Sequence, residues 1–319
     1  MPGSDSDRSE RNVGINRREI LKGGAGLAGA AAWPAAGPSQ AHPTVLDATG
    51  RLLAPFSCNL EMWWKKKPFL DRISLAAAAG FSWVEMWNPT PKAKQGITPE
   101  AIAERAKSEG VRFSCISPGA PDLGDPANHP AFMDWLDDAI ALAKLFEVPR
   151  FNLTGHKLID GLTPEVMMKN YVAALREAAP HLAEAQVMAV VEPYNPFNHP
   201  GHFMYGRQPG LDICRAVDSP WVKLNWDLFH MQRTDGNLIT HLTEGFDQVG
   251  YMQFADSPDR NQPGTGEVSY GPVFQAARKM GYTLPFGAEL NPKDGDAEAA
   301  VRALTNLATQ FELAPGAAE

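Results

Sequence analysis

Oxygen-bearing side chains stand at the ends of four short apolar segments in the second half of the chain. Glu192 follows the run VMAVV, Asp227 closes VKLNWD, Gln253 lies in VGYMQFAD and Glu289 lies in FGAEL. Burying an unpaired carboxylate costs several kcal/mol, so each acid needs water, a partner or a metal ion. If the segments are neighbouring strands, their side chains converge, and a divalent cation offsets the repulsion between the carboxylates. We therefore predict one divalent cation bound by these four residues.

The donor set of this predicted site consists of oxygen atoms and contains no thiolate. Hard oxygen ligands favour Mg²⁺ or Mn²⁺ over copper or structural zinc, and Co²⁺ is tolerated. The alternative is that each acid caps a helix or pairs with a basic side chain, which is the ordinary role of a single strand-end carboxylate. Four such residues on consecutive segments favour the metal site.

These side chains need a scaffold that brings the ends of several strands to one place. After the N-terminal region, short apolar runs alternate eight times with longer amphipathic segments. We predict strands over residues 56–62, 81–87, 111–117, 150–155, 187–193, 222–227, 249–256 and 286–290. We predict helices over residues 68–79, 99–109, 130–146, 164–185, 206–217, 237–248, 270–280 and 297–311.

Nearly continuous apolar strands that alternate with helices predict a parallel sheet covered by helices. Thr98 and Thr163 each precede a proline, as N-caps do, and Gly80, Gly110 and Gly281 follow helices where a left-handed residue is needed. The number of units favours a closed, single-domain α/β fold, the (β/α)8 or TIM barrel, whose active sites form at the carboxyl ends of the strands. An open doubly wound sheet is the alternative, but no strand precedes G-x-G-x-x-G or a P-loop.

The N-terminal region resembles a twin-arginine export signal. The arginine pair lies in NRREILK at residues 16–22, the small-residue stretch GGAGLAGAAAW follows, and SQA at residues 39–41 fits a cleavage site. The apolar part is too short and too rich in glycine for a stable membrane span. We therefore predict cleavage of residues 1–41 after Ala41, a periplasmic mature protein and no membrane attachment after cleavage. Residues 42–54 would form an N-terminal extension, residues 55–311 the barrel and residues 312–319 a C-terminal tail.

Composition limits the class of protein. The chain has 319 residues, 44% of them hydrophobic, and a formal net charge of −8. This acidic balance argues against nucleic-acid binding, which needs clustered lysine and arginine. The densest basic run is KKK at residues 65–67, and a solvated loop is its ordinary interpretation. Cys58, Cys115 and Cys214 have no zinc-binding spacing and are predicted to be core thiols, with one disulfide left open.

Several longer segments resemble hydroxypyruvate isomerase, a family within the xylose isomerase-like barrels that include the ketose 3-epimerases. They are VEPYNPFNHPG (191–201), NWDLFHMQRTDGNL (225–238), MQFADSPDRNQPGTGEVSY (252–270) and GAELNPK (287–293). The PGTGE loop and the D-x-x-H-M-Q motif are the specific signals, and the resemblance covers most of residues 55–311.

The resemblance implies that Glu192, Asp227, Gln253 and Glu289 coordinate one divalent ion, and that Glu192 and Glu289 also form an acid/base pair. Physical chemistry agrees with this assignment. Moving a proton between carbons next to a carbonyl requires a base and something that stabilises the charge of the enediolate, which a Lewis-acid metal does.

Four further side chains are candidate substrate ligands. His230, three residues after Asp227, would donate to a substrate oxygen, and Arg260 would bind a carboxylate, hydroxyls or a phosphate. Glu85 and His156, at the ends of the second and fourth predicted strands, would bind hydroxyls. A packed loop histidine and a surface arginine are the ordinary alternatives. A group of tryptophans near the first two strands suits sugar rings, although packing is their usual role: Trp63, Trp64, Trp83 and Trp87.

We therefore expect a metal-dependent aldose–ketose isomerase or epimerase that acts on a small carbohydrate or keto acid, with hydroxypyruvate as one candidate. Export and the tryptophan group argue against a three-carbon cytoplasmic substrate. Two alternatives stay open: a lyase or dehydratase on a keto-sugar with the same metal and base, and a non-catalytic periplasmic sugar-binding protein. A nuclease of related barrels would need more histidines and a basic groove. The oligomeric state stays open, a homo-oligomer included.

Overall fold

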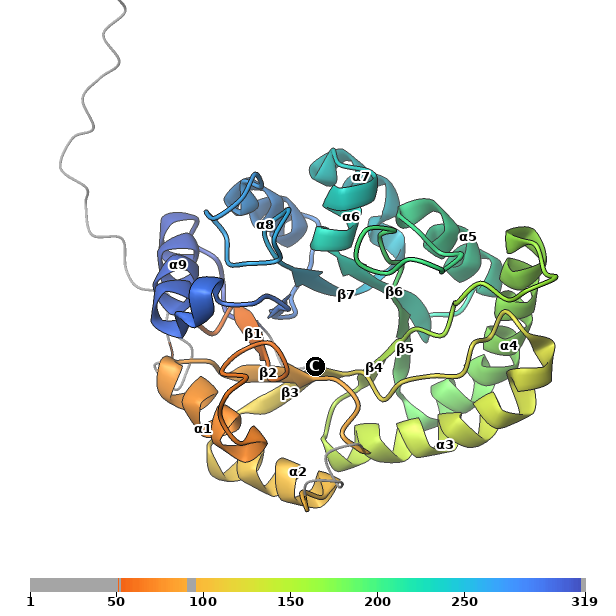
Figure 1. The fold of residues 1–319 in the computed structure, drawn as a ribbon, viewed down its shortest axis with the longest axis horizontal. Coiled ribbons are helices and arrows are strands. Elements are labelled where there is room, and N and C mark those ends of the chain that lie inside the picture. Colours follow the sequence, from red (N-terminus) through yellow and green to blue (C-terminus); the bar gives the residue numbers. More distant parts are fainter. Residues whose placement is uncertain (1–50, 52, 91–95, 317–319) are drawn as a thin grey trace, which may run out of the picture. The chain divides into compact units, whose positions relative to one another are not determined.

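The computed structural model describes residues 51, 53–90 and 96–316. The predicted export signal, its predicted cleavage site and most of the predicted N-terminal extension lie outside the described residues. Within the described part, eight parallel strands close into one barrel in chain order (Figure 1). The strands are β1 (Phe56–Asn59), β2 (Trp83–Met86), β3 (Arg112–Ile116), β4 (Arg150–Leu153), β5 (Met188–Val191), β6 (Val222–Asp227), β7 (Val249–Phe254) and β8 (Phe286–Ala288). The predicted TIM barrel is confirmed.

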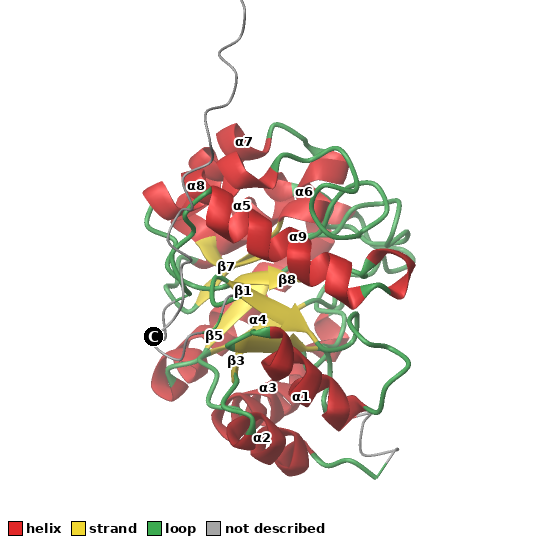
Figure 2. Cartoon of the chain, turned by 90° about the vertical axis from the view of Figure 1, so that its left-hand side faces the viewer, coloured by secondary structure: helices red, strands yellow, loops and turns green. Residues whose placement is uncertain are grey.

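Helices form the outer layer around the strands, as the side view in Figure 2 also shows. They are α1 (Phe69–Ala79), α2 (Pro99–Ser108), α3 (His129–Leu145), α4 (Pro164–Ala185), α5 (Arg207–Val217), α6 (Leu228–Thr234), α7 (Leu238–Gly245), α8 (Tyr270–Lys279) and α9 (Ala297–Gln310). Short 3-10 turns add η2 (Pro126–Asn128), η3 (Phe246–Gln248) and η4 (Lys293–Gly295). Among the described residues, no helix combines the length and hydropathy that a membrane span needs.

The local signals in the sequence set several helix ends. The Thr98 hydroxyl accepts from the Ala101 N–H at 3.3 Å, and Thr163 caps α4 in the same way. Gly80 ends α1 at a φ of 99°, in the left-handed region where a side chain would be strained. These caps fix where α1 ends and where α2 and α4 begin.

The structure departs from the predicted elements around Asp227. The helix α6 begins directly after β6, and no separate helix was predicted there. The Asp227 side chain caps α6 by accepting from the Phe229 N–H at 2.8 Å. The predicted helix over 237–248 is α7 followed by the 3-10 turn η3, and the strand predicted to reach residue 256 ends at Phe254.

Several polar side chains are buried inside the barrel. The Ser57 and Ser114 hydroxyls lie 2.6 Å apart, Ser114 lies 2.8 Å from the Tyr251 hydroxyl, and Tyr251 donates to Glu85 at 2.7 Å. These hydrogen bonds give each of the buried polar groups a partner in place of water. The three cysteines are free and buried, as predicted.

Candidate active site

The four residues predicted to bind a cation lie at the carboxyl ends of β5 to β8, at one end of the barrel. All are buried, with exposures of 4% for Glu192, 0% for Asp227, 3% for Gln253 and 5% for Glu289. Asp227 and Gln253 are direct register partners on β6 and β7. Barrel closure therefore brings the strand ends together, as the sequence predicted.

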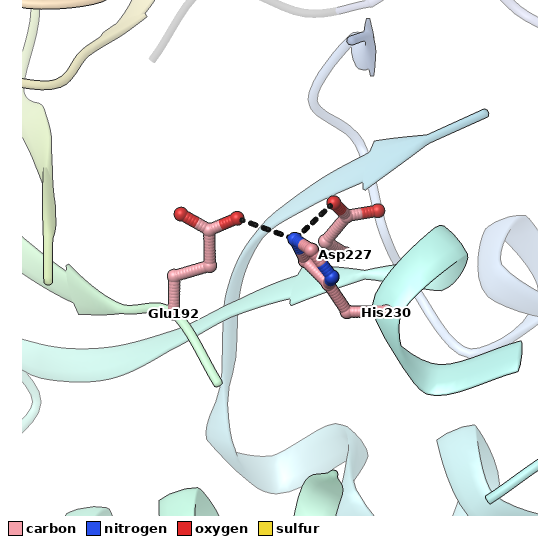
Figure 3. A group of neighbouring side chains, drawn as sticks. All are labelled: Glu192, Asp227 and His230. Carbon is pink, nitrogen blue, oxygen red and sulfur yellow. Dashed lines mark ion pairs between the residues drawn. The ribbon is translucent and has the colours of Figure 1, made fainter. Parts of the chain in front are cut away.

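Glu192 and Asp227 lie on either side of His230, as Figure 3 shows. His230 Nε2 lies 3.5 Å from Glu192 Oε1 and 3.4 Å from Asp227 Oδ2. One atom from each of these three buried side chains falls within 4.8 Å of the others, which is close enough for a shared metal ion. His230 Nε2 thus lies at a similar distance from both acids.

The hydrogen-bond network assigns the tautomer of His230. Asn195 Oδ1 accepts from the backbone N–H groups of Phe197 and Asn198, both at 3.0 Å, so its NH₂ group faces His230 Nδ1 at 2.6 Å. Nδ1 is therefore the acceptor, and the ring proton lies on Nε2. Burial and the nearby Arg260 guanidinium hold the pKa of His230 well below its usual value, so the ring is neutral. His230 thus presents an N–H donor, rather than a lone pair, toward Glu192 and Asp227.

Glu289 is held by two donors. Trp87 Nε1 donates to Oε1 at 2.7 Å, and Arg260 Nη2 donates to Oε2 at 2.7 Å. The same guanidinium nitrogen lies 3.4 Å from Asp227 Oδ2. Arg260 therefore links two of the acids, in the loop position where a substrate-binding guanidinium was predicted.

Gln253 and Glu85 form a second group beside the first. Gln253 Nε2 donates to Glu85 Oε1 at 2.9 Å, while its Oε1 accepts from Asn225 at 2.5 Å. Glu85 also accepts from Asn59 at 3.1 Å and from the Tyr251 hydroxyl. The side chain of Gln253 thus contacts the Glu85 group, and its coordination of a cation shared with the three carboxylates stays a prediction.

The acids at this end of the barrel have raised pKa values because they are buried close to one another. Burial, followed by the charges of Glu289 and Asp227, raises the pKa of Glu192 well above its usual value. Burial raises the pKa of Asp227 to about 7 against the opposing effect of Arg260. Burial and the charge of Glu289 raise the pKa of Glu85 to about 8. Crowded, buried oxygen donors whose charges repel one another fit a divalent cation.

His156 is placed at the site but contacts the backbone. Its Nε2 lies 2.9 Å from the Glu192 carbonyl oxygen, and its Nδ1 lies 3.2 Å from Nδ1 of His202. Burial lowers its pKa to about 3, so the ring is neutral and donates through Nε2 to that carbonyl. The ring of His199 stacks on Tyr194 with centroids 4.0 Å apart. In this arrangement His156 fixes the strand end that carries Glu192.

The tryptophan group divides into packing and site residues. Trp63 is fully buried and donates to the Ala288 carbonyl at 3.1 Å, and the Arg112 guanidinium lies 4.0 Å from the ring centroid of Trp83. Trp87 is 42% exposed and reaches Glu289. Trp64 is half-buried at the mouth. Only Trp64 and Trp87 are placed to meet a ligand.

Sequence reasoning missed three asparagines that hold the site residues. Asn152 donates to Glu192 Oε2 at 2.5 Å, Asn195 orients His230, and Asn225 donates to Gln253. Asn225 lies two residues before Asp227, so the period of two in a strand places both on the same face and could have identified it. Asn152 and Asn195 carry no comparable signal, because their hydrogen bonds join residues 40 and 35 positions apart in the chain.

The barrel, its acidic strand ends and the sequence define one class of protein. The chain belongs to the xylose isomerase-like TIM barrel family, whose model matches residues 73–307.

Two curated relatives match along almost their whole length. Hydroxypyruvate isomerase of Escherichia coli (strain K12) is 29% identical over 241 residues, which cover 75% of this chain and 93% of the relative. The 2-oxo-tetronate isomerase of Cupriavidus necator is 26% identical over 248 residues, which cover 75% of this chain and 94% of the relative. The resemblance to hydroxypyruvate isomerase expected from the motifs is confirmed.

Solved structures show the same fold. A structure described as AP endonuclease, family 2, from Brucella melitensis is 26% identical with a TM-score of 0.70, covering 78% of this chain and 96% of that one. D-psicose 3-epimerase from Clostridium cellulolyticum H10 is 16% identical with a TM-score of 0.65, covering 82% of this chain and 100% of that one. At that identity the epimerase supports the fold alone.

Proposed function

We propose that the protein is a divalent-metal-dependent isomerase or epimerase of a small α-hydroxy carbonyl compound, either a sugar or a keto acid. The observation that carries the proposal is the placement of two buried glutamates, Glu192 and Glu289, directly after β5 and β8 at one end of the barrel. His230 and Arg260 add donors beside them. The names of the relatives, hydroxypyruvate isomerase and 2-oxo-tetronate isomerase, belong to the same reaction class.

The two glutamates divide the work of proton transfer. Glu289 accepts hydrogen bonds from Trp87 and Arg260, and Glu192 accepts one from Asn152, so both side chains are held in place. One carboxyl group can then take a proton from the substrate and the other can return one, as movement of hydrogen between neighbouring carbons requires. His230 Nε2–H and the Arg260 guanidinium would orient the substrate oxygens.

The cation would be held by Glu192, Asp227, Gln253 and Glu289, with Mg²⁺ or Mn²⁺ preferred and Co²⁺ tolerated. The oxygen donors and the raised pKa values of the buried acids support this assignment. When bound, the ion would supply positive charge for substrate oxygens during proton transfer. His230 is not included, because its Nε2 carries the ring proton.

Turnover followed by NMR in D₂O tests the proposal. We expect the Mn²⁺-loaded protein to convert a member of a panel of hydroxypyruvate, 2-oxo-tetronate and ketohexoses, with deuterium incorporated at the reacting carbon. Glu289→Gln should lower kcat at least a thousandfold, because the base is lost while the hydrogen-bonding shape is kept. Glu184→Gln, on the exposed surface of α4, is the matched control and should retain full activity.

The same experiment separates the alternatives. Loss of water from the substrate would indicate a lyase or dehydratase that uses the same residues. Binding without turnover of any compound in the panel would favour a sugar-binding protein. The structure described as an endonuclease does not change the proposal, since this chain is acidic, with a formal net charge of −8, whereas a nuclease needs a basic groove.

We further propose that the protein works in the periplasm after twin-arginine export. The support is the sequence of residues 16–41, which lies outside the described residues. Changing Arg17 and Arg18 together to lysine should leave the uncleaved chain in the cytoplasm, as fractionation and N-terminal sequencing would show. A parent protein found uncleaved in the cytoplasm would contradict export.

A further inference from the structure

A hollow of about 570 Å³ opens among the loops next to the candidate active site. Its wall includes Trp64 and the lysines of residues 65–67 from the β1–α1 loop, Asn261 from the β7–α8 loop, and Asn291 from the β8–α9 loop. The strands β7, β8 and β1 are consecutive neighbours in the closed barrel. The hollow therefore lies at the same end of the barrel as the acids, beside the strand that carries Glu289.

The same two loops carry residues of the hollow's wall and residues of the candidate active site. Asn261 directly follows Arg260, and Asn291 lies two residues after Glu289. The Asn291 N–H donates to the Arg260 carbonyl at 2.8 Å, and the Asn261 side chain donates to the Asn291 carbonyl at 2.8 Å. A ligand whose one end lies at Glu289 would extend over these asparagines toward the lysines.

The lysine loop is held in a fixed shape. Arg72 on α1 donates to the carbonyl oxygens of Leu60 at 2.9 Å, Lys65 at 2.8 Å and Lys67 at 3.0 Å. The Lys67 N–H donates to the Trp64 carbonyl at 2.8 Å, and Trp64 has a left-handed φ of 48°. The left-handed region is uncommon for a residue other than glycine. The left-handed turn at Trp64 and the hydrogen bonds from Arg72 shape the loop in which Trp64 and the lysines line one hollow.

The charge of this wall is opposite to that of the chain. The wall has three lysines and one acid, Asp294, whereas the whole chain has a net charge of −8. All three lysine side chains are exposed, and in the described part of the chain none of them forms an ion pair. Ammonium groups bind carboxylate or phosphate, amides bind hydroxyls, and an indole face packs on the C–H face of a sugar. The wall therefore matches an anionic, hydroxyl-rich molecule.

We propose that this hollow binds the anionic end of a sugar acid or sugar phosphate whose other end lies at Glu289. A volume of about 570 Å³ falls within the range of roughly 300–1,000 Å³ typical of small-ligand sites. The identification of this ligand as the substrate rests on the proposed function. The binding of the anion itself depends only on the wall of the hollow.

Equilibrium binding to the full-length, metal-loaded protein tests the proposal, with D-glucuronate, D-glucose 6-phosphate and D-glucose as probes followed by NMR. We expect at least one anionic probe to bind tenfold or more tightly than glucose, and the better of the two identifies the carboxylate or phosphate preference. The triple variant Lys65→Gln, Lys66→Gln and Lys67→Gln should remove this preference. Trp64→Ala should weaken all three probes.

A matched control separates a local site from overall charge. Lys144→Gln, Lys169→Gln and Lys279→Gln change the net charge equally on exposed positions of α3, α4 and α8, and should leave binding unchanged. The proposal fails if the control loses affinity as much as the hollow variant, or if the parent binds glucose as well as the anions. Binding to phosphatidylglycerol vesicles without binding of either anionic sugar would also overturn it, in favour of a lipid surface.

Failure here is distinguishable from failure of the proposed isomerase activity. Binding is measured without turnover, so an inactive protein that still shows the lysine-dependent preference would contradict the isomerase and keep the anion site. An active enzyme whose KM for an acidic substrate is unchanged by the triple glutamine variant would overturn the assignment of the hollow to the substrate.

Discussion

Asn195 controls which nitrogen of His230 faces the reacting groups. Its amide orientation is fixed by two backbone donors, and the orientation places the histidine proton on Nε2. An aspartate at position 195 would present a carboxylate oxygen to Nδ1 and draw the proton to that nitrogen. The face toward Glu192 and Asp227 would then offer a lone pair in place of a donor.

We therefore predict that Asn195→Asp lowers kcat about a hundredfold, comparable to loss of one donor to a developing oxyanion. The ¹⁵N chemical shifts of the His230 imidazole should show the proton moving from Nε2 to Nδ1. Asn198→Asp adds the same charge to an exposed position of the same loop and should leave both measurements unchanged. If Asn195→Asp kept full activity while the proton lay on Nδ1, the proposal that His230 donates a hydrogen bond through Nε2 would be wrong.

Trp87 links a partly exposed indole to the proposed base. Its backbone N–H donates to Glu61 at 2.9 Å, which fixes the residue, and its Nε1 donates to Glu289 at 2.7 Å. Loss of a hydrogen bond to a charged group costs about 1.5–3 kcal/mol. Trp87→Phe should therefore lower kcat about tenfold to a hundredfold with little change in KM, because the ring remains. Trp87→Ala should also raise KM, and a Phe variant with unchanged kcat would indicate that only the ring matters.

At this scale, the sequence predicted the acids but not their partners. An acid that ends an apolar strand is visible as a pattern, since its burial requires a reason. The contact between Trp87 and Glu289 joins residues 202 positions apart, and nothing local to either residue encodes it. The hydrogen bond from Gln253 on β7 to Glu85 on β2 likewise depends on closure of the barrel, because β8 and β1 lie between these two strands.

The β7–α8 loop is the element that positions Arg260, and Asp256 holds it together. Oδ2 of Asp256 accepts from the N–H groups of Gly264, Thr265 and Gly266, and its Oδ1 accepts from that of Val268. The Asp256 carbonyl also accepts from the Arg260 N–H at 2.9 Å. The acid that follows β7 is thus a structural anchor, and the PGTGE sequence is the segment folded around it.

Gly266 is required in this loop because of close backbone contact. A Cβ there would overlap the Ser257 carbonyl oxygen and lie 2.8 Å from Asp256 Oδ1. Gly266→Ala should therefore displace the loop, lower the free energy of unfolding by about 2 kcal/mol or more, and raise KM through Arg260. Gly264 is the matched control: its φ of 87° disfavours alanine, but nothing lies within 4 Å of the added Cβ.

Urea denaturation and steady-state kinetics check this prediction. Gly264→Ala should lose about 1–2 kcal/mol from backbone strain and keep its KM. Equal effects of the two alanines on KM would show that Arg260 does not depend on the loop shape.

The eight strand–helix units could be predicted because their apolar periodicity and caps are local. The helix α6 could not, since its N-cap is Asp227 itself. Asp227 ends β6, caps α6 and faces the site. The sequence predicts the strand end and the site role, and the helix cap only as an alternative to that role.

The whole molecule sets the pH dependence of stability through two opposing groups of buried side chains. The folded-state pKa values of Glu85 and Asp227 are raised to about 8 and about 7, so the unfolded chain releases those protons at lower pH than the fold. Stability from these acids is complete below about pH 4 and falls as pH rises toward 8. His156 and His199 have pKa values lowered to about 3 and about 4, so their contribution is lost as pH falls below about 6.5.

These opposing effects predict a broad maximum in the Tm of EDTA-treated protein near about pH 5.5. Above about pH 7 the histidines are neutral in both states and only the acids contribute, Glu85 alone by roughly 2 kcal/mol between about pH 6.5 and 8. Mn²⁺ binds deprotonated carboxylates, so its stabilising effect should be larger at pH 8 than at pH 6. Asp227→Asn should reduce the stabilisation by Mn²⁺. The control Glu184→Gln should change neither the pH of the Tm maximum in EDTA nor the stabilisation by Mn²⁺. A Tm that keeps rising from pH 6.5 to 8 in EDTA would show that these acids are not forced together in the metal-free fold.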